Sequence, residues 1–426
     1  MHPLHRSTRA LAAACLVVAA TIVTAEEWPQ FRGPGGRAIG TSAPVAWSDA
    51  ENLLWKTALP GGGSSSPIVQ GDAIFVTCWS EGGPKQGPAR HLLKIDRRDG
   101  TVVWQRDIAS PTPEDPYAGY LTEHGYASNT PVTDGAMVWA FFGKAGIVAF
   151  DMEGSEIWRA GVGSESSNRR WGSGASLILH GDHLICNASE ESQSIRALDK
   201  RTGKEIWRAE GAALELAYGT PGVVTLPDGS EEVVVAVPGE VWGLDPRTGK
   251  LRWHAEMGLT GNVSPSVVVD GDTVYVFGGF RSSGSLAVRA GGRGDVSKTH
   301  ILWTSRTSSY VATPVLHDGH LFWIDDKGIA FCSDAKTGKE IYKERVREIT
   351  SGGRPVYASP VVADGRVYVV TRHDGTIVLP AAPRYEVLAH NVFAGDDTDA
   401  SGTPALVDGR VYLRSGSFLY AIGSTK

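Results

Sequence analysis

The sequence is poor in cysteine. Four cysteines occur in 426 residues, and the three beyond residue 25 are Cys78, Cys186 and Cys332. An odd number of widely spaced cysteines cannot form a complete disulfide framework, and neither C-x-x-C nor C-x-x-C-H occurs, which excludes the cysteine-based zinc spacings and covalent haem attachment. We expect these three cysteines to be small buried apolar side chains.

The chain also lacks an excess of basic residues and has few long helical patterns. With 41 Lys and Arg against 47 Asp and Glu, the formal net charge is −6. Without a positive excess to neutralise phosphates, the chain is not a basic nucleic-acid-binding protein. In contrast, 52 Gly and 13 Trp are many for this length. This composition excludes a disordered chain and favours many short strands joined by tight turns.

The first 25 residues have the pattern of a secretory signal peptide. Arg6 and Arg9 precede an apolar run over residues 10–23, and small residues lead up to a cleavage site after Ala25. The run is short for a membrane span. Retention as an anchor and lipidation of Cys15 are the alternatives. We therefore predict cleavage after Ala25, a periplasmic or secreted protein, and no membrane span in the mature chain.

One phrase ending in an aromatic residue recurs along the chain. Asp199 is followed by Thr202, Gly203 and Trp207, and in each copy a glycine precedes the aromatic residue by four positions. The copies end at Trp104, Trp158, Trp207, Trp253 and Tyr342, with Trp303 as a degenerate member. The average step is about 48 residues, which is close to the period of a four-stranded propeller blade.

Each unit opens with a second phrase, in which Ser or Thr precedes Pro, a β-branched run and an Asp/Gly turn. Such turns are hairpin signals, and proline is tolerated as the first residue of a strand. The phrase begins at Ser66, Thr130, Thr220, Ser264, Thr313, Ser359 and Thr403, with residues 173–176 in the remaining unit.

Eight openings predict eight blades, but the last unit ends after its third strand. Residues 52–56 supply the missing strand, because Trp55 lies 49 residues before Trp104, in register with the repeat. We predict an all-β, eight-bladed β-propeller of four-stranded blades over residues 51–426, preceded by an N-terminal extension at 26–50. The N-terminal strand completes the last blade and closes the ring, which removes open sheet edges.

The segment from Ala197 to Trp207, A-L-D-K-R-T-G-K-E-I-W, resembles the tryptophan-docking motif of quinoprotein-type, PQQ-like β-propellers. The resemblance extends through the repeat over nearly the whole mature chain. It implies structural roles between neighbouring blades for the aromatic residues, and a large aromatic ring at a blade seam buries apolar area. These docking residues are Trp55, Trp104, Trp158, Trp207, Trp253 and Tyr342. Residues 27–34 are also similar to the leader of secreted PQQ-like repeat proteins.

This resemblance implies either a PQQ-dependent dehydrogenase that also binds calcium or a non-catalytic protein similar to BamB. The methanol- and ethanol-type dehydrogenases carry two adjacent cysteines over the quinone, and no Cys-Cys occurs here. Calcium needs several converging oxygen ligands, for which Asp396, Asp397 and Asp399 are candidates, with a solvated turn as the alternative. Glu123 beside His124 is a candidate acid–base pair, with ordinary surface residues as the alternative. We predict no catalytic residue, no metal site and no cofactor, with PQQ and calcium as the alternative.

A ligand site is expected on the propeller face where each outer strand connects to the next inner strand. Tyrosine recurs just before the inner strand in four units, and residues 110–128 form a long insertion that adjoins this face. Arg169 and Arg170 suit a carboxylate or sulfate, with an ion pair to Glu165 or Glu215 as the alternative. The predicted ligand-binding residues are Tyr126, Arg169, Arg170, Trp171, Tyr218, Asn262, Tyr310 and Tyr357. The alternative is that each tyrosine caps its own blade or plugs the channel.

These patterns together predict a secreted or periplasmic, non-catalytic binding or assembly scaffold. We expect a monomer whose partner is a protein or a glycan of the cell envelope, and no nucleic-acid partner. A PQQ- and calcium-dependent dehydrogenase is one alternative, and a glycan-binding or glycan-cleaving propeller is the other. The fold alone does not choose among these ligands.

Overall fold

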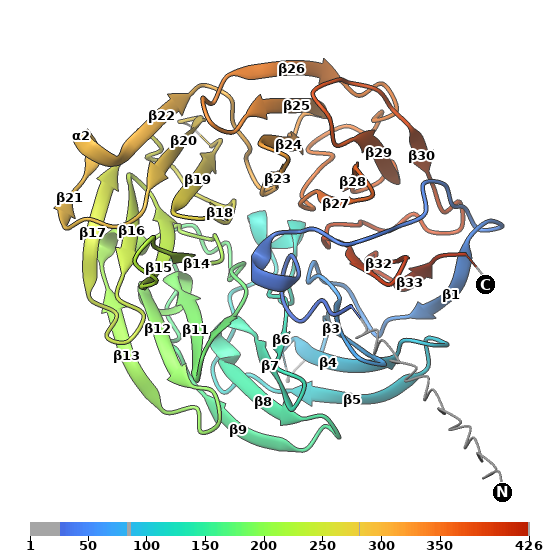
Figure 1. Ribbon diagram of the computed structural model, residues 1–426. Coiled ribbons are helices and arrows are strands. Elements are labelled where there is room, and N and C mark those ends of the chain that lie inside the picture. The colour runs from blue at the N-terminus through green and yellow to red at the C-terminus, as the bar shows by residue number, and fades with distance from the viewer. Residues whose placement is uncertain (1–25, 83–86, 281, 425–426) are drawn as a thin grey trace, which may run out of the picture.

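The protein is a ring of eight β-sheets (Figure 1). A computed structural model describes residues 26–82, 87–280 and 282–424, and the predicted signal peptide, residues 1–25, lies outside the described residues. None of the described helices is long and apolar enough to cross a membrane. The helices are short turns: η1 (Pro34–Gly36), η2 (Gly119–Glu123), η3 (Gly143–Ala145), η4 (Ala212–Leu214), α1 (Ser189–Ser192) and α2 (Ser297–His300). The all-β, eight-bladed prediction is therefore confirmed.

Each blade is an antiparallel sheet whose first strand lies nearest the channel. The first four blades along the chain are β2 (Ile68–Gln70), β3 (Ala73–Ser80), β4 (Ala89–Asp96) and β5 (Val102–Ile108); β6 (Val132–Thr133), β7 (Met137–Phe141), β8 (Ile147–Asp151) and β9 (Glu156–Ala160); β10 (Ile178–His180), β11 (His183–Ala188), β12 (Ser194–Asp199) and β13 (Glu205–Glu210); and β14 (Gly222–Thr225), β15 (Glu231–Val237), β16 (Glu240–Leu244) and β17 (Leu251–Glu256).

The other four blades follow the same order. In the fourth blade, the short strand β21 (Gly294–Asp295) pairs in parallel with β17 and forms a fifth strand of that sheet. These blades are β18 (Val268–Asp270), β19 (Thr273–Gly278), β20 (Gly284–Arg289) and β22 (Ile301–Ser305); β23 (Val315–His317), β24 (His320–Ile324), β25 (Ile329–Asp334) and β26 (Glu340–Arg345); β27 (Val361–Ala363), β28 (Arg366–Val370), β29 (Thr376–Pro380) and β30 (Ala389–Asn391); and β31 (Ala405–Val407), β32 (Arg410–Arg414), β33 (Phe418–Ile422) and β1 (Leu53–Ala58).

The N-terminal strand closes the ring as predicted. In the last blade, β1 pairs with β33, and Trp55 lies opposite Ala421. The Trp55 and Tyr412 rings are 6.1 Å apart. Arg97 of the first blade also contacts the last blade. Its Nε donates to the Tyr412 hydroxyl at 2.8 Å, and its Nη2 pairs with Asp408 at 2.6 Å.

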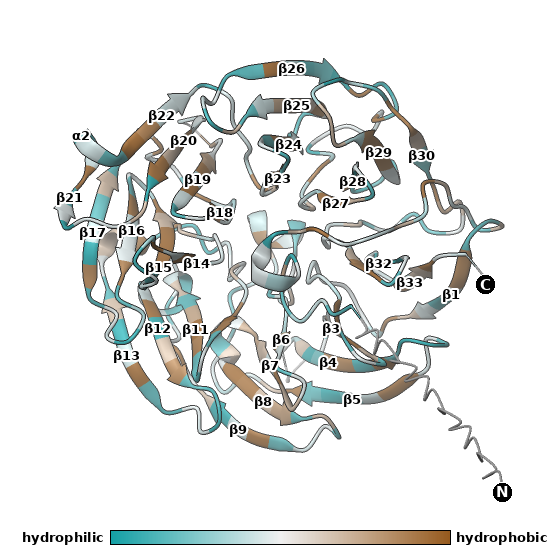
Figure 2. Ribbon diagram, viewed as in Figure 1, coloured by the Kyte–Doolittle hydropathy of each residue, from teal (hydrophilic) through white to brown (hydrophobic). Residues whose placement is uncertain are grey.

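Apolar side chains fill the layers between the blades. Figure 2 shows hydrophobic residues along the middle strand β8, whereas the outer strand β26 alternates between hydrophobic and hydrophilic residues. The outer strands alternate because one of their faces meets the next layer and the other meets solvent. Cys78, Cys186 and Cys332 lie in this core as free, buried thiols, as expected.

Eight buried Ser and Thr residues form a closed hydrogen-bonded ring around the channel. In each link, the backbone N–H of one blade's residue donates to the side-chain hydroxyl of the next blade's residue, at 2.9–3.1 Å. The members are Ser66, Thr130, Ser176, Thr220, Ser266, Thr313, Ser359 and Thr403. Because the Thr403 N–H donates to the Ser66 hydroxyl, the last blade is tied to the first.

The ring corrects the sequence interpretation of the fifth blade. There the Ser-Pro phrase places the hydroxyl at Ser264, but the ring uses Ser266. Every ring residue lies two positions before the first residue of its inner strand, as Ser266 does before Val268. Ser264 instead accepts a hydrogen bond from Asn262 Nδ2 at 2.9 Å. The distance from the strand, and not the proline, fixes the position of the hydroxyl.

A second set of contacts lies near the rim, where an aromatic residue of one blade meets the turn of the next. Trp158 Nε1 donates to the Lys200 carbonyl at 3.0 Å. Gly203, in the same turn, has φ of +70°, and a Cβ there would lie 2.5 Å from the Trp158 ring, so this position requires glycine. Among the described residues, five outer-strand tryptophans make this contact: Trp55, Trp104, Trp158, Trp207 and Trp303.

Two of the predicted docking residues are placed differently. Trp253 Nε1 donates to the buried Glu232 carboxylate of its own blade at 2.6 Å, and the same carboxylate accepts from the Gly291 N–H of the following blade at 3.1 Å. Tyr342 packs against Tyr385, with the rings 5.9 Å apart. In the two following blades the third strand ends at Arg289 and at Pro380, and both blades lack the aspartate that begins the turn in the blades that receive a docking tryptophan.

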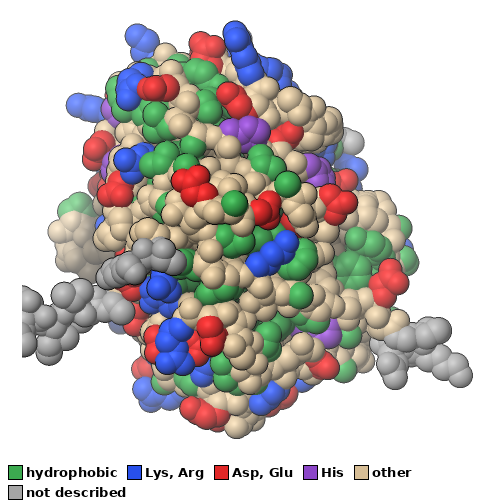
Figure 3. Space-filling model, turned by 90° about the vertical axis from the view of Figure 1, so that its right-hand side faces the viewer, with side chains coloured by type: hydrophobic (Ala, Val, Ile, Leu, Met, Phe, Trp, Pro, Cys, Tyr) green, Lys and Arg blue, Asp and Glu red, His purple; other side chains and the backbone are tan. Residues whose placement is uncertain are grey.

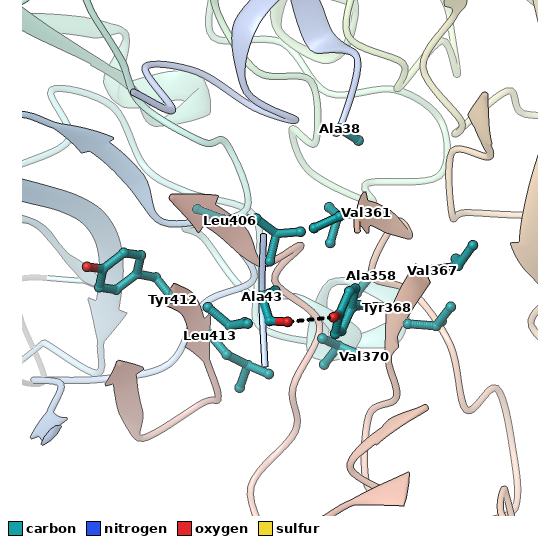
Figure 4. Close-up of a cluster of buried hydrophobic side chains, with 14 of the residues drawn as sticks. Ala38, Ala43, Ala358, Val361, Val367, Tyr368, Val370, Leu406, Tyr412 and Leu413 are labelled. Carbon is teal, nitrogen blue, oxygen red and sulfur yellow. Dashed lines mark hydrogen bonds between the residues drawn. The ribbon is translucent and has the colours of Figure 1, made fainter. Parts of the chain in front are cut away.

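The N-terminal extension crosses one end of the channel before it reaches β1. In Figure 1 this dark-blue segment, with η1, lies over the centre of the ring. The Trp28 N–H donates to the Val69 carbonyl at 2.9 Å, and the Val362 N–H donates to the Ala38 carbonyl at 2.8 Å. Figure 4 shows the segment passing between two blades, where the Tyr368 hydroxyl donates to the Ala43 carbonyl at 3.1 Å. We call this side of the propeller the plug face.

The hydrogen-bonded ring can be tested with Thr220→Val. This change removes the acceptor of the Ser176 N–H and leaves that buried group unpaired, so we expect the free energy of unfolding to fall by about 1–3 kcal/mol. Thr225→Val, on an exposed residue of β14, is the control and should change it by less than about 0.5 kcal/mol. Denaturant unfolding of both variants gives the comparison. Equal stability of the two variants would contradict a structural role for the ring.

Candidate functional site

The loops between blades gather at the opposite end of the channel from the plug. They connect each outer strand to the next inner strand, and we call this side the loop face. Rigid blades hold these loops in place, which is a common arrangement for a binding site. The loops that carry the candidate site span residues 109–131, 161–177, 211–221, 306–314 and 346–360.

Six aromatic side chains meet at the channel end of the loop face, and we call them the aromatic mouth. The Trp171 ring lies at their centre, with centroid distances of 4.6 Å to Tyr120 and 5.9 Å to Tyr218. Phe280, from the turn between β19 and β20, lies 5.8 Å from Trp171 and 5.6 Å from Tyr310. The members are Tyr120, Trp171, Tyr218, Phe280, Tyr310 and Tyr357.

Tyr120 crosses the mouth and connects its two sides. It belongs to η2, within the long insertion, so the insertion covers the channel as expected. Its hydroxyl donates to the Tyr357 hydroxyl at 3.1 Å. Burial is the main cause that raises the pKa of Tyr120, and burial likewise raises the pKa of Tyr218 and Tyr310. These phenols are therefore protonated at neutral pH and present hydrogen-bond donors.

His124 holds the insertion against the loop that carries Trp171. His124 Nε2 lies 2.7 Å from the Trp171 carbonyl, and Nδ1 lies 2.6 Å from the Ser128 hydroxyl. Since a carbonyl only accepts, Nε2 carries the proton. Burial lowers the pKa of His124, which favours this neutral form. Glu123 points elsewhere and pairs with Arg372 at 2.7 Å, so the two residues do not form an acid–base pair.

Arginine side chains surround the mouth. The Arg354 guanidinium lies 4.6 Å from the centre of the Tyr310 ring, and that of Arg372 lies 4.7 Å from the Tyr357 ring. Both distances suit cation–π attraction. Arg169 lies over Trp171 at 5.8 Å and is exposed. Arg354 and Arg372 also have carboxylate partners, Asp326 at 3.7 Å and Glu123 at 2.7 Å, so Arg169 brings the exposed positive charge to the mouth.

A cavity of about 150 Å³ lies beneath the mouth, inside the channel. Tyr120, Trp171, Tyr218 and Tyr357 line it from the loop face, and Phe31 of the N-terminal extension lines it too. All eight hydroxyl residues of the ring border it as well. Among the described residues, the lining contains no Asp, Glu, Lys or Arg. The mouth residues thus border the cavity at one end and Phe31 at the other, and the described wall between them is uncharged and rich in hydroxyl groups.

The structure brings four of the eight predicted ligand-binding residues into the aromatic mouth: Trp171, Tyr218, Tyr310 and Tyr357. Arg169 adjoins them through Trp171. Arg170 is exposed on the same loop, with φ of +52°. Among the described residues, neither arginine forms the alternative ion pair with Glu165 or Glu215. The Glu215 carboxylate instead accepts from the Asn168 N–H at 3.1 Å.

The other two predicted residues are not members of the aromatic mouth. Tyr126 packs against Trp79 at 5.1 Å, and its hydroxyl donates to the Asp115 carbonyl at 2.7 Å. Tyr126 lies between the first two blades. The path of the insertion directs Tyr126 away from the channel and Tyr120 toward it. Asn262 is buried in a side pocket that Trp171 and Phe280 also line, and its Oδ1 has no hydrogen-bond partner among the described residues.

Two of the candidate calcium ligands, which belong to the alternative to a protein without a metal site, are held in separate contacts. The Asp396 carboxylate accepts from the Tyr420 hydroxyl at 2.7 Å. Asp399 pairs with Arg372 on the other side of the loop. Asp396 and Asp399 thus each have their own protein partner, and Asp397 is exposed.

The predicted ligand-binding set omits four contributors to the mouth: Tyr120, Phe280, Arg354 and Arg372. Of these, Tyr120 and Arg354 lie in the connections where the site was expected. Tyr120 and Tyr126 both precede the same inner strand, and no sequence pattern distinguishes the inward side chain. Phe280 and Arg372 lie in hairpin turns within blades, where the repeat predicts only turn residues. A search for aromatic and basic residues in all loop-face connections and hairpins would have found them.

Two adjacent buried carboxylates lie beside the mouth, on α1. Glu190 Oε1 accepts from the Ser167 N–H and hydroxyl, and Tyr218 donates to Oε2 at 3.4 Å. Glu191 is 1 % exposed, and its Oε2 has no hydrogen-bond partner among the described residues. Burial, followed by repulsion from Glu190, raises the pKa of Glu191 to about 8. Burial also raises the pKa of Glu190.

This raised pKa predicts a stability that depends on pH. The folded state binds the Glu191 proton more tightly than the unfolded state does, so its contribution to stability is complete at acidic pH and is lost as pH rises to about 8. Glu191→Gln keeps a neutral side chain at all pH values. We therefore expect a smaller fall in melting temperature between about pH 5 and pH 8 in this variant than in the wild type. The exposed Glu165→Gln is the control, and a variant with an unchanged fall would contradict a neutral Glu191.

The fold and its docking contacts define a PQQ-like β-propeller. A family model described as "Outer membrane protein assembly factor BamB" matches residues 40–171, 90–344 and 295–382, which is well over half of the chain. The chain belongs to this BamB family. It is similar to the outer membrane protein assembly factor BamB of Burkholderia pseudomallei (strain K96243), with 23% identity over 334 residues that cover 76% of this chain and 78% of that protein.

Two further similarities are informative. The crystal structure of BamB from Moraxella catarrhalis has a TM-score of 0.62 at 14% identity and covers 88% of this chain and 98% of that chain, which shows a shared fold. Quinohemoprotein alcohol dehydrogenase ADH-IIG of Pseudomonas putida is 25% identical over 201 residues, which are 45% of this chain and 24% of that enzyme. The similarity to this enzyme is thus restricted to a minor part of it.

The channel lining does not fit PQQ with calcium. PQQ carries three carboxylates, which need cationic or donor partners, and calcium needs several oxygen ligands, usually with carboxylates among them. The described lining of the cavity offers hydroxyl, aromatic and small side chains without a counter-charge for either group. That the protein binds no cofactor stays a prediction.

Proposed function

We propose that the protein is a non-catalytic binding or assembly scaffold of the cell envelope that holds a protein segment at its aromatic mouth. The observation that carries this proposal is the aromatic mouth itself, a cluster of rings and arginines from five blade connections over an uncharged channel. Aromatic and arginine side chains dominate the energetics of many protein interfaces. The names of the BamB relatives describe assembly factors for outer membrane proteins, which supports a protein as partner.

The proposal includes export, as the predicted signal peptide requires. Residues 1–25 would direct the chain to the periplasm or out of the cell, where the mature protein acts as a monomer. A protein segment with aromatic, proline or acidic side chains would suit the mouth, because tyrosine hydroxyls donate hydrogen bonds and arginines face its edge. A glycan is the alternative occupant.

The outer rim is the competing surface. Exposed aliphatic residues lie on the outer strands, most of them next to a docking aromatic residue, as Val103 (53 % exposed) and Ile206 (43 %) do. Figure 3 shows one side of the rim, where acidic and basic side chains are interspersed with hydrophobic ones. The rim residues are spread over many blades, whereas the mouth residues converge at one point. We therefore assign binding to the mouth.

The test compares a mouth variant with a rim variant. Trp171→Ala combined with Tyr120→Ala removes the centre of the mouth, and Ile206→Ala removes an exposed rim side chain. Binding of the wild type and the variants is measured on two arrays. One carries overlapping peptides that span the envelope proteins of the organism that makes this protein, and the other carries glycans. We expect peptide binding by the wild type, a loss of roughly tenfold or more in affinity for the mouth variant, and no loss for the rim variant.

Melting temperatures separate a binding defect from misfolding. The mouth variant should retain the cooperative unfolding of the wild type, since the blades and both rings of interblade contacts remain. If the wild type binds glycans and none of the peptides, the partner is a carbohydrate and not a protein. Loss of peptide binding in Ile206→Ala, with retention in the mouth variant, would move the site to the rim.

A further inference from the structure

The plug end of the channel contains a buried arginine with unused hydrogen-bond donors. Arg32 is 1 % exposed and follows Phe31, which borders the channel cavity. Its Nη2 donates to the Pro314 carbonyl at 2.8 Å. Among the described residues, its Nε and Nη1 have no hydrogen-bond partner although both atoms are buried. A buried cation without a counter-charge is strongly unfavourable, so this arrangement needs an explanation.

The backbone at Arg32 adopts an unusual conformation beside the cavity that this residue lines. Arg32 has φ of +62°, a left-handed conformation that costs energy for a residue other than glycine. The neighbouring Gly33 has φ of +70°, and a Cβ there would lie 2.7 Å from the Trp28 ring. Trp28 is fully buried and exchanges two backbone hydrogen bonds with Val69. Trp28 thus anchors the segment, and the two left-handed residues turn the guanidinium inward.

The surroundings of Arg32 offer donors and no counter-charge. A cavity of about 200 Å³ borders it, and this cavity shares Phe31, Thr220 and Ser266 with the channel cavity. Among the described residues, its lining contains no Asp or Glu, and no carboxylate lies within ion-pair distance of Arg32. His180, also in the lining, faces Glu231 at 3.5 Å. Arg32 is therefore the one full positive charge in the described lining.

The hydroxyl ring adds further donors to the same cavity. Thr220 Oγ1 accepts from the Ser176 N–H, and Ser266 Oγ accepts from the Thr220 N–H. Neither hydroxyl donates its own proton to an acceptor among the described residues, so both protons are available to a ligand. Gln30, in the same lining, carries an amide with two more donors. Burial lowers the pKa of Arg32 to about 9, which leaves it charged at neutral pH.

We propose that the plug end of the channel is a binding site for an oxyanion, a carboxylate, phosphate or sulfate group, held by Arg32 Nε and Nη1. The hydroxyls of Thr220 and Ser266 and the Gln30 amide supply the remaining donors. An anion provides the counter-charge that the protein lacks and satisfies the unpaired donors. This site is separate from the aromatic mouth and does not depend on the function proposed for it.

The test is calorimetric titration of the full mature chain with sulfate, phosphate and acetate at constant ionic strength. We expect at least one of them to bind to the wild type, and Arg32→Gln to weaken this binding roughly tenfold or more. Arg37→Gln is the matched control, because Arg37 lies on the same segment and is exposed. Binding of acetate would identify a carboxylate site, and binding of only sulfate or phosphate would identify a site for tetrahedral oxyanions.

Two results would overturn the proposal. One is the absence of binding by all three anions, and the other is equal binding by wild type and Arg32→Gln. If Arg32→Gln does not fold, crystals of the wild type soaked in selenate, an oxyanion with an anomalous scatterer, provide the second measurement. Anomalous density beside Arg32 Nε or Nη1 is expected there, and density for water alone at that position would refute an anion site.

Discussion

A closed ring of eight hydrogen bonds around the channel is the constraint on which the rest of the structure depends. Each link joins the backbone of one blade to a side chain of the next, so no blade can move outward without breaking two buried hydrogen bonds. The hydrogen bond between Thr403 and Ser66 closes this ring by joining the last blade to the first. The tryptophan contacts near the rim fix the angle between blades at a larger radius. Inner and outer contacts together make the propeller one rigid frame.

This frame gives the two ends of the channel different chemistry. On the loop face, connections of different length bring aromatic rings together above the hydroxyl ring, with Trp171 at their centre. On the plug face, the N-terminal extension is held by Trp28 and inserts Phe31 and Arg32. One end thus presents aromatic rings edged by arginines, and the other encloses a single buried cation. The hydroxyl-lined channel lies between them.

The sequence predicted the fold well because the repeated contacts are local in sequence. Each tryptophan lies at a fixed distance from a turn that recurs in the next blade, and the spacing of Trp55 predicted closure by β1. Where the repeat is degraded, prediction failed: Trp253 uses Glu232 in its own blade, and Trp303 docks without belonging to a complete phrase. These contacts depend on what the following blade offers.

The candidate site was less predictable, since it depends on the direction of side chains in irregular loops. Tyr120 and Tyr126 are six residues apart in one insertion, and only the path of that insertion turns one toward the channel and the other toward Trp79. Arg32 was part of a recognised leader, but nothing in the sequence indicates that its guanidinium is buried without a counter-charge. Both features arise from contacts between segments far apart in the chain.

The central claim is that the protein works through its channel mouth, and photo-cross-linking from defined positions tests it most directly. A photoreactive amino acid at Val311, in the wall of the channel cavity, is compared with one at Ile206 on the rim, each in the full chain expressed in intact cells. We predict that position 311 forms a covalent adduct with a protein of the cell envelope and that position 206 does not. Adducts from position 206 without adducts from position 311 would contradict the claim.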